Sequence, residues 1–210
     1  MCLVMSGAIF YENRKNLILE FVSYFKYVST SQIDSEIFCL SSGKTKCRYV
    51  LKRLYDDSCL KRFREHEYIY YVGRKSPDWK SVFILNQLYF DIKDKGKIIK
   101  YQPELEFFSG RCDGFFVAEY RGDKRKFFVE VDRSTTTFKK SKIYNTLLQT
   151  DWESEWWADP LKRGVISFPL IVVLTMRRHI VERDFKDAKF VYHILDLYNP
   201  KWINIFKTIA

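Results

Sequence analysis

Three carboxylates stand in two neighbouring apolar segments, at positions from which their side chains can converge. Asp113 begins the first segment, and Glu130 and Asp132 end the second. The residues between the segments, Arg121 to Lys124, include a glycine and an aspartate, which predicts a β-hairpin. Because side chains alternate between the two faces of a strand, we expect all three acids on one face at the open end of this hairpin.

The register of the hairpin decides which acids face each other. If the turn is centred on residues 122 and 123, Phe115 lies opposite Glu130, and Asp113 lies opposite Asp132. Carboxylates held this close repel one another unless a divalent cation, a basic side chain or open solvent relieves the repulsion. The three acids Asp113, Glu130 and Asp132 are therefore the predicted metal ligands, with Mg²⁺ as the cation.

The same pattern resembles the core of the PD-(D/E)xK nucleases, in which a lysine follows the second acid by two positions. Asp132 occupies that position here, so the lysine would have to come from elsewhere. Lys126 lies on the predicted acidic face, and Lys139, Lys140 and Lys142 follow in the next helical segment. Two alternatives stay open: a catalytic site made of Asp113, Glu130, Asp132 and Lys126, or a nuclease-like scaffold without activity, which we favour.

The elements around this hairpin indicate a mixed α/β sheet. Strands are expected at Ile98 to Tyr101 and at Phe168 to Thr175, and the second is apolar without alternation, as in a strand covered on both faces. A helix is expected over Phe138 to Gln149, and a strand and a closing helix at the end of the chain. The acidic residues thus belong to a restriction-endonuclease-like α/β domain, residues 76–210.

The first third of the chain has a different pattern, with three helices and a hairpin. Apolar residues recur at helical spacing over Glu12 to Phe25, a short helix capped by Thr30 or Ser31 runs to Phe38, and a third helix starts after Ser42. Two short β-rich runs, Cys59 to Arg64 and Tyr68 to Val72, follow. This order predicts a winged helix-turn-helix over residues 1–75, and an α+β protein overall.

Basic residues are concentrated in the third helix and in the following hairpin. A cationic helix can enter the major groove, and cations on the hairpin can contact the adjacent phosphates. The predicted DNA-contacting residues are Lys44, Thr45, Lys46, Arg48, Tyr49, Lys52, Arg53, Lys61, Arg62 and Arg64. The alternative is a solvated charged face on a domain used for protein contacts.

One segment of the third helix imitates a nucleotide-binding loop. Ser42-Gly43-Lys44-Thr45 looks like the end of a phosphate-binding loop, but the required first glycine would fall at Phe38. No buried strand is expected before it. ATP or GTP binding is therefore rejected, and no cofactor is expected, apart from Mg²⁺ if the protein is a nuclease.

Composition limits the classes of protein that remain. A net charge of +10 and an isoelectric point near 9.3 favour an anionic partner, and 18% aromatic residues exclude a disordered chain. The first apolar stretch is too short for a spanning helix, which predicts a cytoplasmic protein without membrane contact. The five cysteines lack a C-x-x-C pair and are expected to be reduced and mostly buried.

Several segments together resemble the replication-relaxation family of plasmids and other mobile elements. They are Arg111-Cys112-Asp113, the run Phe127 to Thr135, the lysine-rich helix with Tyr144, and Phe168 to Thr175 followed by arginines. Cys112 departs from the proline that the family commonly has before the aspartate. The resemblance covers nearly the whole chain and implies a role in replication control, transfer or their regulation, with other replication or transfer proteins as partners.

These observations lead to two functional expectations and one open question. The first is a double-stranded DNA-binding protein acting as a homodimer, since winged helices usually act in pairs. The alternative is a Mg²⁺-dependent DNA nuclease targeted by the winged helix. The open question is whether Trp152, Trp156 and Trp157 cover the sheet or bind a partner, and whether Arg177 and its neighbours bind phosphate or neutralise acids.

Overall fold

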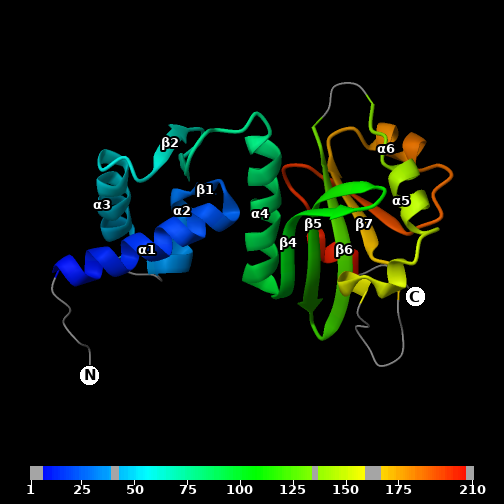
Figure 1. The fold of residues 1–210 in the computed structure, drawn as a ribbon, viewed down its shortest axis with the longest axis horizontal. Helices are drawn as coiled ribbons and strands as arrows, with labels where there is room; N and C mark the ends of the chain where they lie inside the picture. The colour runs from blue at the N-terminus through cyan, green and yellow to red at the C-terminus, as the bar shows by residue number, and fades with distance from the viewer. Residues whose placement is uncertain (1–6, 39–42, 134–136, 159–166, 207–210) are drawn as a thin grey trace. The chain divides into compact units, whose positions relative to one another are not determined.

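The computed structural model describes residues 7–38, 43–133, 137–158 and 167–206, without the side chains of residues 7–10 and 43–44. The chain divides into two compact units, residues 1–86 and 87–210 (Figure 1). The division falls inside helix α4 (Trp79–Lys95), whereas the sequence placed it between residues 75 and 76. Within the described residues, no helix is both long and apolar enough to cross a membrane.

The first unit contains short helices and a three-stranded antiparallel sheet with the order β1-β3-β2. Its elements, in chain order, are α1 (Gly7–Phe25), β1 (Val28–Ser29), α2 (Thr30–Ile33), a π-helical turn η1 (Asp34–Phe38), α3 (Gly43–Asp56), β2 (Lys61–Arg64) and β3 (Tyr68–Tyr71). β1 is the short strand between α1 and α2, and it pairs with β3, so this connecting segment is part of the sheet. The helices and the hairpin thus belong to one folded unit.

Most of the apolar positions predicted for the first and third helices are buried in this unit, but Leu17 of α1 is exposed. Ile18 and Val22 of α1 are fully buried, as are Leu51 and Leu54 of α3, which places the spaced apolar residues inside. The cap of α2 is Ser29 rather than Thr30 or Ser31. The Ser29 hydroxyl accepts from the Gln32 backbone N–H at 3.2 Å, and the Gln32 side chain accepts from the Ser29 N–H at 2.8 Å, which completes a capping box.

The second unit is built on a five-stranded sheet with the order β4-β5-β6-β7-β8. The strands are β4 (Lys97–Phe107), β5 (Gly110–Tyr120), β6 (Asp123–Asp132), β7 (Leu170–Thr175) and β8 (Tyr192–Asp196). β4, β5 and β6 are antiparallel, whereas β6, β7 and β8 are parallel. The expectation of an α+β protein with a mixed sheet is therefore confirmed.

Aromatic and aliphatic side chains cover both faces of this sheet. One face packs under α5 (Ser141–Leu147) and α6 (Arg178–Asp184), in a core that includes Phe115, Phe128 and Tyr144. On the other face Phe116 stacks on Phe127 at 5.2 Å between ring centroids, and Tyr101 joins Phe116 to Tyr89 of α4. Trp202 of the final turn η4 (Trp202–Phe206) packs against Tyr120.

The β5–β6 hairpin has a different turn from the expected one. Its central residues are Arg121 and Gly122, with φ angles of 51° and 83°, which is the conformation that a two-residue hairpin turn requires. Tyr120 therefore pairs with Asp123, and Phe115 pairs with Phe128 instead of Glu130. The expected register was wrong by two residues.

This change of register keeps the predicted faces and moves the acids along the strands. A shift of two residues leaves every side chain on its face, because the side-chain period of a strand is two. It brings the Phe115 ring to 5.6 Å from Phe128 in the core. The β5–β6 ladder ends at the pair Gly114 and Val129, so Asp113 does not pair with Asp132 as expected.

Candidate functional site

The outer surface of α3 carries most of the predicted DNA-contacting residues. Thr45, Lys46, Arg48, Tyr49 and Lys52 are all exposed, and Tyr49 keeps 64% of its surface accessible. They project outward because the apolar positions of α3 are taken up by the core. Lys44 lies in α3, but its side chain is outside the described residues, and so is the predicted helix cap Ser42.

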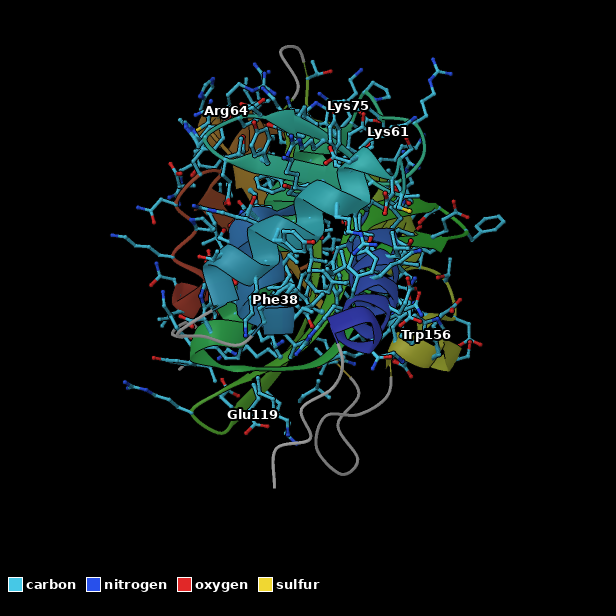
Figure 2. The ribbon with its side chains drawn as sticks, turned by 90° about the vertical axis from the view of Figure 1, so that its left-hand side faces the viewer. Phe38, Lys61, Arg64, Lys75, Glu119 and Trp156 are labelled. Carbon is cyan, nitrogen blue, oxygen red and sulfur yellow. The ribbon has the colours of Figure 1, made fainter. Side chains whose placement is uncertain are left out.

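Two cations of strand β2 extend this exposed basic surface. Lys61 and Arg64 stand at the two ends of β2 and are exposed (Figure 2). The turn that joins β2 to β3 is hydrogen-bonded to α2. The Glu67 carboxylate accepts from the Ser31 hydroxyl at 2.7 Å and from the Ser31 N–H at 2.9 Å. The hairpin is thereby fixed to the helices of the first unit.

Two other predicted DNA contacts have partners within the protein. The Arg62 guanidinium lies between the rings of Tyr55 and Tyr68, 4.2 Å from each centroid. The Arg53 guanidinium lies 3.9 Å from the centroid of Tyr11 and pairs with Asp57 at 4.0 Å. Arg62 thus joins α3 to the hairpin.

The acidic residues of the second unit each have partners, beginning with Glu130. Its side chain is only 2% exposed, and its two oxygens meet two donors from the region of α5. The Tyr144 hydroxyl donates to Oε1 at 2.6 Å, and the Lys140 ammonium lies 2.8 Å from Oε2. Burial nevertheless raises the pKa of Glu130 to about 7, because the loss of hydration outweighs the attraction of Lys140.

Asp113 lies close enough to this pair to interact with it. Its Oδ2 accepts from the backbone N–H of Val131 at 2.7 Å. Burial raises the pKa of Asp113, while the Val131 N–H and the Lys140 ammonium act in the opposite direction. Asp113, Glu130, Lys140 and Tyr144 thus form one polar cluster, which we call the acidic cluster.

Asp132 belongs to a separate group at the carboxyl ends of the parallel strands. Thr175 donates to its Oδ2 at 2.8 Å, and the Arg177 guanidinium lies 3.1 and 3.2 Å from its two oxygens. Arg177 therefore neutralises an acid, as one of the two alternatives for it predicted. In the observed register Asp132 does not lie opposite Asp113, and its neighbour on the other side is Thr175 of β7.

The lysine at the acidic cluster comes from the segment that leads into α5. Among the sequence candidates, Lys140 contacts Glu130, whereas Lys126 is buried and donates to the carbonyl of Ala158 at 2.9 Å. Lys140 also donates to the Arg111 carbonyl at 3.0 Å. Sequence spacing alone did not distinguish Lys140 from its neighbours, because the direction of a long side chain depends on how α5 packs.

The oxygens of the predicted Mg²⁺ ligands Glu130 and Asp132 have donors within the protein, and the Mg²⁺ site stays a prediction. The oxygens of Glu130 face a hydroxyl and an ammonium, and those of Asp132 face Thr175 and Arg177. Over the described ranges, no group of three His, Cys, Asp or Glu side chains could hold a metal ion. The counter-charges of these acids are basic side chains of the protein itself.

The tryptophans lie in two 3₁₀ turns, η2 (Trp152–Ser154) and η3 (Trp156–Ala158). Trp157 is buried and packs against Phe128 at 5.1 Å and Trp152 at 6.0 Å. These two rings therefore cover the sheet. Trp156 is 40% exposed, and the Lys100 ammonium lies 3.7 Å from its ring centroid.

The described cysteines agree with a reduced protein. Cys47 and Cys112 are buried and Cys59 is partly exposed, and all three are free thiols. Burial raises the pKa of the Cys47 thiol to about 12, which makes it a poor nucleophile. Cys2 and Cys39 lie outside the described residues.

Comparison with known proteins gives only distant structural similarity. No protein-family model matches the sequence, and no curated protein matches it. The fold is similar to a structure of the restriction endonuclease FokI bound to DNA, with a TM-score of 0.34, 11% identity and coverage of 99% of this chain. A second FokI structure gives a TM-score of 0.34, 9% identity and 94% coverage. The chain spans less than half the length of these proteins, 47% and 44% respectively.

Proposed function

We propose that this protein binds double-stranded DNA through its first unit, which we interpret as a winged helix-turn-helix. In this proposal α3 enters the major groove, and the hairpin β2–β3 is the wing that contacts the backbone. The observation that carries the proposal is the exposed face of α3. Its polar side chains point outward together with Lys61 and Arg64 of the hairpin, in a unit whose element order is that of a winged helix.

The charges on this surface set the expected salt dependence. Five exposed cations are available for phosphates, and they are Lys46, Arg48, Lys52, Lys61 and Arg64. Each cation that neutralises a phosphate releases counterions, so the logarithm of the association constant should fall with the logarithm of salt concentration with a slope of about −4.5 per protomer. A surface used for protein contacts would give no such slope.

The experiment is a titration of labelled duplex DNA with the full chain across a salt series. The DNA includes random sequence and the region upstream of the protein's own gene. Changing both Lys46 and Arg48 to alanine should make the slope shallower by about 2 and weaken binding. The matched control changes Lys97 and Lys124, two exposed lysines of the second unit, to alanine. An equal loss with the control pair, or no duplex binding by the wild type, would contradict the proposal.

The cellular role that we propose follows the resemblance to the replication-relaxation family. The protein would act in replication control, transfer or their regulation on a plasmid or other mobile element, as a homodimer in the cytoplasm with other replication or transfer proteins as partners. Sedimentation velocity with and without DNA measures the predicted dimer. Preferred binding to DNA from a replication origin or transfer region would support this role over general DNA binding.

The nuclease alternative stays a prediction. Lys140 contacts Glu130, as a nuclease lysine could, but the same contact occupies an oxygen that a metal would need. The samples from the DNA titration, incubated with Mg²⁺ or Mn²⁺ and separated on a denaturing gel, test this alternative directly. Cleavage that disappears in Asp113→Asn would establish it, and intact DNA would exclude it under those conditions.

A further inference from the structure

A phenylalanine stands almost completely exposed at the tip of a hairpin in the second unit. Phe108 keeps 96% of its surface accessible, more than any other large apolar side chain described as exposed. It lies with Ser109 in the turn between β4 and β5, beyond the last pair of the ladder, Phe107 and Gly110. A ring in this position loses the stabilisation that burial would provide, which makes it a candidate contact for a partner.

The turn that carries Phe108 is anchored on both sides. The preceding residue, Phe107, packs its ring 5.4 Å from Phe128 and 6.1 Å from Tyr144 in the core. The following Gly110 lies so near α5 that an added Cβ would approach the Ile143 side chain to 3.1 Å. The Phe108 ring therefore extends from a fixed base, and a partner that binds it does not first have to order a loose loop.

The surroundings of this tip are basic. Arg111 follows the turn and is exposed, and Lys140 donates to its carbonyl at 3.0 Å, which places the start of α5 against the hairpin. Lys139 and Lys142 are also exposed on this segment. Two acids lie among these cations: Glu106 is the strand partner of Arg111, and Asp184 accepts from the backbone N–H groups of Lys140 and Ser141. Lys140 is paired with Glu130, and the three exposed cations Arg111, Lys139 and Lys142 still outnumber these two acids.

We infer that Phe108 stacks on an unpaired base of a DNA strand whose phosphates contact Arg111, Lys139 and Lys142. An isolated aromatic ring within a basic surface fits a nucleic acid better than a protein, because any base offers a stacking face and each phosphate offers a negative charge. The apolar residues next to the tip, Phe107 and Ile143, are partly buried, so they add little to an apolar patch that a protein partner would bury. The inference deepens the proposed function by giving the second unit its own contact with DNA.

The test compares two DNA probes with the full chain. One is a fully paired duplex, and the other is the same duplex ending in an unpaired fork. Phe108→Ala should weaken fork binding about 10-fold, the loss expected for one stacked base, and leave duplex binding unchanged. Phe108→Trp should retain fork binding. Tyr198→Ala is the matched control, since Tyr198 is 71% exposed and follows β8 at the opposite edge of the sheet.

A second readout detects the stacking itself. A 2-aminopurine base in the unpaired arm changes its fluorescence when a ring stacks on it, and this change should be lost in Phe108→Ala and kept in Tyr198→Ala. Equal fork affinity and equal fluorescence in the wild type and Phe108→Ala would overturn the inference. It would also be overturned if Phe108→Ala abolished self-association in sedimentation velocity and left fork binding intact, because the ring would then bind a second copy.

The probes also separate this inference from the proposed function. If Lys46→Ala with Arg48→Ala weakens duplex binding and Phe108→Ala has no effect on the fork, only the inference fails. If the wild type binds the fork through Phe108 but does not bind the duplex, the proposed function fails and the inference stands. Binding to neither probe would overturn both.

Discussion

Replacing Glu130 by glutamine should change how the stability of the protein depends on pH. The folded state holds a proton on Glu130 up to about pH 7, whereas the unfolded chain loses it near the ordinary value of 4.5. Between these two values the folded state binds more protons, so the free energy of unfolding falls as pH rises. The contribution of a neutral Glu130 is therefore fully present below pH 4.5 and is lost as pH rises through about 7.

The difference between the two pKa values sets the size of the effect. A shift from 4.5 to about 7 corresponds to about 3 kcal/mol. Glutamine has nearly the same shape, can still accept from the Tyr144 hydroxyl, and does not titrate. The stability of Glu130→Gln relative to the wild type should therefore increase by about 3 kcal/mol between acid and mildly alkaline pH.

Urea unfolding of both proteins, followed by tryptophan fluorescence, measures this difference at several pH values. Trp157 packs on Phe128 of the same core and should report its loss. Subtracting the wild type cancels the other titrating groups. A second variant, Tyr144→Phe, removes a hydrogen bond that holds the pKa of Glu130 down, so the fall in stability should move to higher pH. A relative stability of Glu130→Gln that is constant over the whole range would refute the reasoning.

Three further predictions concern other parts of the structure in the full chain. Ser29→Ala removes the capping box of α2 and should cost about 1 kcal/mol in urea unfolding, while an unchanged midpoint would contradict the role of the cap. Arg64→Ala should make the salt slope of DNA binding shallower by about 1, whereas Arg62→Ala should destabilise the fold by about 1 kcal/mol and change the slope little, since its guanidinium lies between two rings. Arg177→Ala should destabilise by about 3 kcal/mol because it leaves Asp132 buried without its counter-charge, and Asp132→Asn in the same background should restore part of the loss.

The parts of the fold that follow a periodic pattern were predictable from the sequence. The apolar positions of α1 and α3 repeat at helical spacing, and the structure buries those of α3 and most of those of α1, with Leu17 as an exposed exception. The hairpin was predictable as an element, and its faces were predictable because alternation survives a shift of two residues. Its register was not, since it depends on whether Arg121 adopts a positive φ, and few residues other than glycine do so.

Other elements carried too weak a local pattern. β4 continues to Phe107, far beyond the expected Tyr101, although Pro103 and a positive φ of 52° at Glu104 interrupt it. These interruptions are compatible with a strand at the edge of the sheet, because an edge strand forms backbone hydrogen bonds to a neighbouring strand on one side only. Helix α6 was not expected, because its seven residues are mostly polar and too few to show an apolar repeat at helical spacing.

The acidic cluster was predictable in composition but not in arrangement. Asp113 and Glu130 were expected together, and the structure places them close enough to interact. Asp132 was expected with them, but in the observed register it forms an ion pair with Arg177 instead. The sequence offered several lysines at similar distances along the chain, and only the packing of α5 brings Lys140 to Glu130.

The position of Lys140 gives the buried Glu130 a counter-charge that belongs to the chain itself. A metal-bound acidic site loses its counter-ion to a chelator or to a competing cation, but an ammonium on the chain is present whenever the fold is present. The same ammonium also contacts the Arg111 carbonyl beside the Phe108 turn. The Lys140 side chain is thus both the counter-charge of Glu130 and a hydrogen-bond donor to the β4–β5 hairpin. Removing it should therefore affect the buried Glu130 carboxyl group and the exposed Phe108 turn together.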